Sequence, residues 1–235
     1  MLGFKISENM NFSEYLLDSK DSLIKTLNKR IGALKQIKKV ASFKAKLNIA
    51  NGIVMTKILY LLPLYGGCPE YLLSAIQTKQ SEAMTQVTGR RWIVPGKQFV
   101  STAELLKQCG WLSVRQLIFY TTVLNVHKTL VIETPEVIYE KQTSGRMHRT
   151  RAAGNISVKR TCVNEARLTI ATSSFRWRGH QQHSSLPNNL KDESNLTVFK
   201  CRLKSWVRNN VPIEYYVILT PCQSLLTMAK IIFYL

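Results

Sequence analysis

Residues 23–37 read LIKTLNKRIGALKQI and residues 43–61 read FKAKLNIANGIVMTKILYL, and these two stretches decide the fold. In the first stretch, apolar residues recur every three or four positions: Leu23, Leu27, Ile31, Leu34 and Ile37. This spacing lines one face of an α-helix and leaves the lysines between them pointing away from it. The first stretch is therefore predicted to be an amphipathic helix with a cationic outer face.

The second stretch repeats the helical pattern from Phe43 to Leu61. Ser42 is a candidate N-cap, and we expect the helix to stop at Gly66 and Gly67, where glycine can take a positive φ. Two helices joined by a few residues predict an antiparallel pair, here called the basic hairpin.

The charge of this hairpin points to a polyanionic partner. Ten Lys or Arg residues and one acid, Asp21, lie between Lys20 and Lys57, and the whole chain carries a formal net charge of +19. Lysines on a solvated helix face are ordinary, but this total far exceeds the magnitude of about 2 to 8 that suffices for solubility. We favour nucleic acid over an anionic membrane, because the basic residues are spread along the chain.

The composition predicts a globular, intracellular protein. At 235 residues and 45% hydrophobic content, the chain can bury a sizeable core in one or two domains. Its five cysteines are odd in number and widely spaced, and no apolar signal segment opens the sequence, so we expect reduced thiols and no secretion. A zinc site built from Cys162, His180, His183 and Cys201 is disfavoured, because no Cys-x-x-Cys pair is present.

Five segments are expected along the chain. They are a short strand within residues 1–10, a helical bundle over 11–140, a basic linker over 141–160, a smaller α+β region over 161–213, and an apolar tail over 214–235. Pro221, Gln223 and Lys230 interrupt the tail, which disfavours a membrane span. The fold class is therefore predicted to be mainly α, with one N-terminal strand.

Within the bundle, a third helix is expected from Pro69 to about Thr88, followed by two helices opened by capping boxes. The boxes pair Ser101 with Glu104 and Ser113 with Gln116, and the second helix should reach about Leu130. In the C-terminal region, SFRWR at residues 174–178 alternates aromatic and basic residues and predicts an extended segment. A final helix over residues 196–207 is expected behind Ser194.

The candidate nucleic-acid-binding residues come from the hairpin, from an Arg-Arg-Trp cluster at residues 90–92 and from the SFRWR segment. They are Lys25, Lys29, Arg30, Lys35, Lys38, Lys39, Lys44, Lys46, Lys57, Arg90, Arg91, Arg176 and Arg178. Arginine beside an aromatic ring can stack on bases or contact phosphate, although a loop anchored by a buried tryptophan gives the same pattern.

Several blocks, in this order and spacing, resemble one known family. They read LGFKIS, LIKTLNKRIGALKQI, NGIVMTKILYLLPLYGG, LLSAIQTKQSEAMTQVTG, LLKQCGWLSVRQLIFY, SFRWRGHQQHSSLPNNL and LTVFKCRLKSWV, between Leu2 and Ile213. Together they resemble the C-terminal (thumb and post-thumb) region of non-LTR (LINE-type) retrotransposon reverse transcriptases. Two blocks are the most specific. One is GWLSVRQL, and the other is SFRWRG together with the SLP and LK-x-W residues that follow SFRWRG. The family usually has Trp-Asn where this chain has His183-Ser184, and the tail after Ile213 matches nothing in the family.

This resemblance implies a thumb, residues 22–88, that grips template and primer, after a remnant of the last palm strand at residues 2–7. It implies RNA and DNA as partners, together with the missing palm, whose Mg²⁺ ions serve the intact enzyme. The apolar tail can be interpreted as translation past the natural end of the element.

Catalysis by this chain is not expected. A two-metal polymerase needs carboxylates converging on metal ions roughly 3.5 to 4 Å apart. The chain has only Asp18, Asp21 and Asp192, and none lies in an Asp-Asp turn. A nucleophilic site is also disfavoured, because no acid is placed to orient the base. Its base would be His180 or His183, and its nucleophile Ser184 or Ser185. No cofactor is expected, and the alternative function is a helical interaction module that binds an acidic partner protein.

Overall fold

The computed structural model describes residues 12–37, 39–89, 101–132 and 175–213. The expected strand at 2–7, the linker at 141–160 and the tail at 214–235 lie outside these ranges. Ten α-helices and two π-helical turns make up the described part, which contains no strand. They are η1 (Glu14–Asp18), α1 (Leu23–Ile37), α2 (Phe43–Ala50), η2 (Asn51–Met55), α3 (Thr56–Leu59), α4 (Leu62–Tyr65), α5 (Glu70–Thr88), α6 (Thr102–Cys109), α7 (Val114–Ile132), α10 (Phe175–Ser184), α11 (Asn188–Lys191) and α12 (Leu196–Asn210).

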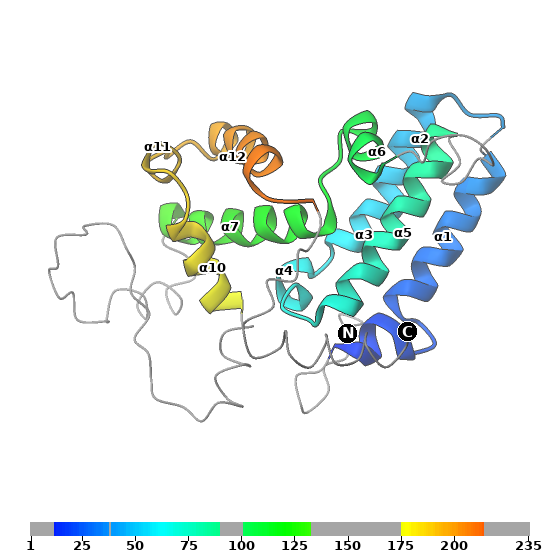
Figure 1. The fold of residues 1–235 in the computed structure, drawn as a ribbon, viewed down its shortest axis with the longest axis horizontal. Coiled ribbons are helices and arrows are strands. Elements are labelled where there is room, and N and C mark those ends of the chain that lie inside the picture. Colours follow the sequence, from blue (N-terminus) through cyan, green and yellow to red (C-terminus); the bar gives the residue numbers. More distant parts are fainter. Residues whose placement is uncertain (1–11, 38, 90–100, 133–174, 214–235) are drawn as a thin grey trace, which may run out of the picture.

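The mainly α-helical prediction is confirmed, and the first hairpin helix matches α1. Leu23, Leu27, Ile31 and Leu34 are at most 2% exposed. They pack mainly against α5, which lies beside α1 in the bundle (Figure 1). The 3.6-residue period of the sequence thus places α1 correctly on the core.

The second hairpin helix begins as predicted but ends earlier. The Ser42 side chain accepts a hydrogen bond from the Ala45 amide at 3.3 Å, and α2, η2 and α3 follow without a break in the helical backbone. The helix then ends at Leu59, because Pro63 has no amide hydrogen and its ring clashes with the carbonyl four residues earlier.

The expected positive φ at the glycines is wrong. Leu61 takes the left-handed conformation, with φ of 57°, whereas Gly66 has φ of −65°. Gly66 is required for another reason: a Cβ there would lie 2.7 Å from Ile118 Cγ2. The missing side chain lets α4 approach α7.

The next three helices follow the predicted signals. Gly89 and Gly110 end α5 and α6 with φ of 73° and 68°. Ser101 Oγ accepts from the Glu104 amide at 3.2 Å. Before α7, Ser113 Oγ accepts from the Gln116 amide at 3.3 Å, and Gln116 Oε1 accepts from the Ser113 amide at 3.1 Å, which completes a reciprocal capping box.

The C-terminal region differs from the α+β prediction, because its described part, residues 175–213, is helical. Residues 175–178 of the SFRWR segment open α10. This helix packs so closely on α7 that a Cβ on Gly179 would lie 2.6 Å from Val126 Cγ2. Among its described side chains, the buried ones are Gly179, His180 and His183, and none of these gives an apolar periodicity.

The last helix, α12, runs antiparallel to α7. Gln116 Nε2 donates to the Val211 carbonyl at 2.8 Å, while His127 meets the Glu193 carbonyl near the other end of α7. The N-cap is Asn195, whose side chain accepts from the Thr197 amide at 2.9 Å, and not the expected Ser194. None of the helices in the described ranges combines the length and the apolarity needed to cross a membrane.

Candidate nucleic-acid interface

The basic hairpin presents lysines on its solvent side with no acidic residue in its sequence. Residues 22–69 contain no Asp or Glu. The candidate residues whose side chains are exposed are Lys25, Lys29, Lys35, Lys39 and Lys44. These side chains create a positive field that favours a polyanion and that salt screens.

On α1, Lys25 and Lys29 lie one turn apart and opposite the buried leucines. Lys25 Nζ donates to the Ser19 carbonyl at 3.1 Å, which keeps this charge near the start of the helix. Like charges four residues apart on a helix repel each other. A row of phosphates would relieve that repulsion.

Two predicted contacts are used within the protein. Arg30 is half-buried, and its guanidinium donates to the Ile53 carbonyl in η2, so it joins the two hairpin helices. Lys57 is half-buried, with Nζ 5.3 Å from the centre of the Tyr60 ring, which is within cation–π range. Lys46 is half-buried as well.

The remaining candidates do not join this surface within the described residues. Lys38, Arg90 and Arg91 lie outside the described ranges, and the side chain of Arg176 is not described. Arg178 is half-buried and donates to the Pro63 carbonyl at 2.8 Å, so it ties α10 to α4. Arg178 therefore has a structural contact that sequence periodicity does not reveal.

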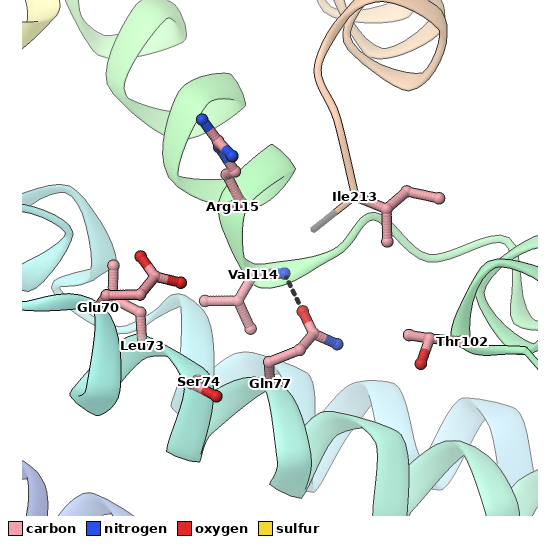
Figure 2. Close-up of a pocket in the computed structure, with 8 residues that line it drawn as sticks. All are labelled: Glu70, Leu73, Ser74, Gln77, Thr102, Val114, Arg115 and Ile213. Atoms are coloured by element: carbon pink, nitrogen blue, oxygen red, sulfur yellow. Dashed lines mark hydrogen bonds between the residues drawn. The ribbon is translucent and has the colours of Figure 1, made fainter. Parts of the chain in front are cut away.

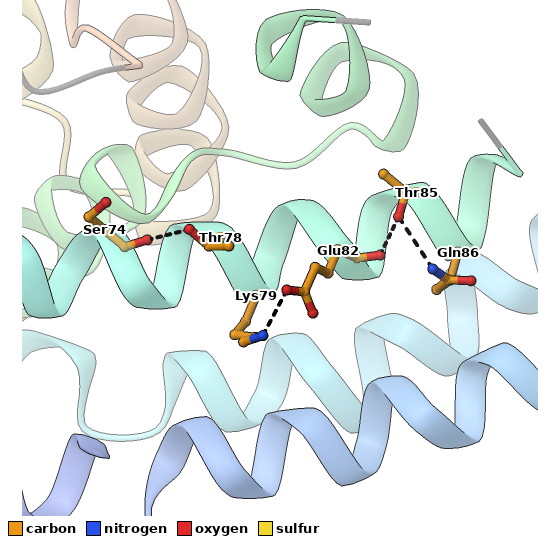
Figure 3. Close-up of polar contacts among 6 residues, drawn as sticks. All are labelled: Ser74, Thr78, Lys79, Glu82, Thr85 and Gln86. Atoms are coloured by element: carbon orange, nitrogen blue, oxygen red, sulfur yellow. Dashed lines mark hydrogen bonds and ion pairs between the residues drawn. The ribbon is translucent and has the colours of Figure 1, made fainter. Parts of the chain in front are cut away.

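The neighbouring helix α5 satisfies many of its polar groups locally (Figure 3). Lys79 Nζ lies 2.7 Å from Glu82 Oε1, Thr78 Oγ1 donates to the Ser74 carbonyl at 3.0 Å, and Thr85 Oγ1 donates to the Glu82 carbonyl at 2.7 Å. The side chain of Gln86 also contacts Thr85. The positive charge of the hairpin therefore does not extend onto α5, which carries Lys79 together with Glu70 and Glu82.

A cavity of about 260 Å³ lies between α5, the start of α6 and the start of α7 (Figure 2). Gln77 Oε1 on its wall accepts from the Val114 amide at 2.8 Å. Burial raises the pKa of Glu70, and nearby Arg115 partly offsets that shift. This cavity offers one carboxylate, which does not make a two-metal site.

Three histidines pack where α7, α10 and α12 meet. His127 Nε2 lies 2.8 Å from the Glu193 carbonyl, so Nε2 carries the proton and Nδ1 is left as an acceptor. His183 Nε2 lies 3.5 Å from that Nδ1 and donates to it, and His180 is buried beside them. Burial is the main cause that lowers the pKa of both His127 and His183, the latter to about 4.

His183 and Ser185 are each hydrogen-bonded to a group other than one another. His183 Nε2 faces His127, and the Ser185 hydroxyl donates to the Gln182 carbonyl at 2.7 Å. The ring of His127 stacks on Phe199 with centroids 3.6 Å apart. Cys201 is exposed on α12, and no group of three metal-ligating side chains occurs in the part of the chain that the structure describes.

Comparisons with models of known protein families, with curated proteins and with solved structures gave no match to this chain.

Proposed function

We propose that this chain is a nucleic-acid-binding fragment of a non-LTR retrotransposon RNA-directed DNA polymerase, which grips an RNA/DNA template–primer duplex. The observation that carries the proposal is the set of exposed lysines of the basic hairpin, here called its lysine face, in a stretch of 48 residues, 22–69, without an acid. The set is Lys25, Lys29, Lys35, Lys39 and Lys44. Contacts to phosphates by lysine supply affinity that does not depend on sequence, which is what a template–primer grip requires.

The blocks that resemble the family support the proposal, because some of their residues make hydrogen bonds between different helices. Trp111, within GWLSVRQL, donates from Nε1 to Asn51 Oδ1 at 2.8 Å and joins the start of α7 to the hairpin. Arg178, within SFRWRG, joins α10 to α4. Residues that connect helices in this way fix how the helices pack. They are therefore residues that proteins sharing this fold would be expected to share.

The proposed role is binding without catalysis. Asp21 precedes α1 and Asp192 caps the C-terminal end of α11, two helices that lie apart in the described part of the molecule (Figure 1). In the proposed whole enzyme, Mg²⁺ and its carboxylates belong to a palm region outside this chain. That palm is a proposed second partner.

The test is binding of a fluorescently labelled RNA/DNA hybrid duplex, measured by anisotropy at several salt concentrations. We expect binding that weakens steeply as salt rises. No binding at low salt, or equal capture of an acidic protein with a shallow salt dependence, would overturn the proposal in favour of a protein-interaction module. A primer-extension assay with Mg²⁺ should show no incorporation above background.

A further inference from the structure

A second basic surface lies on the outer side of α12. Lys200, Lys204 and Arg208 are exposed and spaced by four residues, so they follow one another along the helix. The row beside it, one step of 100° around the helix, consists of buried Phe199, Leu203 and Val207. The helix itself contains no acidic residue.

This surface is connected to the basic hairpin through the end of α6. Arg208 Nη2 donates to the Gly110 carbonyl at 3.3 Å, across 98 residues of sequence. The next residue, Trp111, donates a hydrogen bond from Nε1 to Asn51 Oδ1 in the hairpin at 2.8 Å. Figure 1 shows α12, α6 and α2 following one another along one edge of the molecule.

Basic side chains occur on all three elements of this edge. Lys107 is exposed in the last turn of α6, three residues before Gly110. Lys44 is exposed on α2, and its spacing of seven residues places it on the same helix face as Asn51. The face of Asn51 is the one that contacts Trp111, so Lys44 belongs to the side of the hairpin that faces this edge.

The charges on α12 also have a spacing suited to phosphates. Residues four apart rise by about 6 Å along a helix. Successive phosphates of one strand rise by about 3.4 Å along a duplex axis, so each basic residue can meet roughly every second phosphate. Arg202, on another side of α12, is engaged by Glu193 at 3.1 Å and is not part of this row.

We propose that Lys107, Lys200, Lys204 and Arg208 form a second contact surface for the nucleic-acid backbone, continuous with the hairpin along the α12–α6–α2 edge. A duplex long enough to follow this edge contacts both surfaces at once. This inference rests on the proposed function and adds the C-terminal helix to the grip. Two linked contacts raise affinity beyond that of either one alone.

The first test removes three charges, in the variant Lys107→Gln, Lys200→Gln and Lys204→Gln. Arg208 is kept because it holds the Gly110 carbonyl. For a long hybrid duplex, the log-log salt slope should become flatter by up to about three units. The matched control, with arginine at the same three positions, keeps the charge and should keep the slope.

The outcomes separate this inference from the proposed function. An unchanged slope, in a protein whose binding is still weakened by loss of hairpin lysines, overturns the second surface and leaves the proposed function standing. Failure of the unmodified chain to bind any duplex overturns both.

A second test measures proximity through Cys201, which is exposed on α12 within the basic row. Burial raises the pKa of Cys68 to about 12 and that of Cys109 to about 11, so neither reacts readily at neutral pH. In a chain with Cys162→Ser and Cys222→Ser, a photocrosslinker on Cys201 should attach to the bound duplex.

The control for proximity places the crosslinker on α10, by Gln181→Cys combined with Cys201→Ser. Gln181 is exposed, and α10 lies on the other side of α7 from α12 (Figure 1). This probe should give little crosslinking. Stronger crosslinking from α10 than from α12 would overturn the proposed surface.

Discussion

Arg30 and Lys29 are neighbours on α1, yet they have different surroundings. Lys29 is exposed opposite the core, whereas Arg30 lies beside Ile31 at the edge of the core and donates to the Ile53 carbonyl. A step of 100° around the helix separates a surface charge from a contact between helices. The sequence shows both as basic residues, and only the packing of the second helix separates their roles.

The first prediction concerns this pair. Arg30→Gln should lower the free energy of unfolding by about 1 to 2 kcal/mol, because a charged donor to a part-buried carbonyl is lost. Lys29→Gln, the matched control, should change it by less than about 0.5 kcal/mol. Urea denaturation measures both. Equal stability of the two variants would contradict the structural role of Arg30.

The second prediction concerns the buried histidines. The pKa values of His127 and His183 are lowered in the folded protein, so the unfolded chain binds protons more readily. Stability should therefore be complete above pH 6.5, the ordinary value, and fall as the pH drops toward about 4, where His183 titrates in the folded state. After burial, the charges of His127, Lys191 and His180 add to the lowering of the His183 pKa, while Glu193 opposes the lowering of the His127 pKa.

Urea midpoints measured between pH 7 and pH 4 test this expectation. The variant His183→Gln should show a shallower loss of stability with acid than the unmodified chain, because one titrating group is removed. An identical pH dependence in both proteins would show that His183 is not the group responsible.

Among the helices, replacing either of two glycines by alanine should change the stability of the fold, in opposite directions. A Cβ on Gly66 would lie 2.7 Å from Ile118 Cγ2 and 2.9 Å from the Leu62 carbonyl oxygen, so Gly66→Ala should destabilise the α4–α7 contact by about 1 to 3 kcal/mol. Gly32, within α1, has nothing within 4 Å of its Cβ position, and Gly32→Ala should stabilise the helix by about 0.5 to 1 kcal/mol. Thermal unfolding gives both signs, and a stabilising Gly66→Ala would contradict the close packing of α4 on α7.

The elements that could be predicted are those with local signals. The leucine period of α1, the Ser42 cap and the box of Ser113 with Gln116 are each encoded within a few residues, and each forms as expected. The break before Pro63 also has a local signal, the proline itself, which the prediction of one helix through Leu61 overlooked. The helix α10 has no such local signal. Among the described side chains of α10, the buried residues are a glycine and two histidines, which become interior residues because α7 packs on them.

At the scale of the whole molecule, the candidate site was only partly visible in the sequence. The exposed lysines of α1 and α2 follow from helical periodicity and the absence of acids. The contacts of Arg178 with Pro63 and of Arg208 with Gly110 join residues 115 and 98 positions apart. Such pairings depend on how the helices pack against one another. The hydrogen bond of Arg178 to Pro63 and the alignment of α12 with the hairpin could therefore not be predicted from the sequence.

We propose that the lysine face of the basic hairpin binds the phosphate backbone of the duplex. The most direct test is the salt dependence of hybrid-duplex binding by the variant Lys25→Gln, Lys29→Gln, Lys35→Gln and Lys44→Gln. Lysine-to-arginine changes at the same four positions serve as the control. We predict that the glutamine variant flattens the log-log slope by up to about four units, equally for all duplex sequences, while the arginine variant keeps the original slope. A glutamine variant with an unchanged slope would contradict the claim.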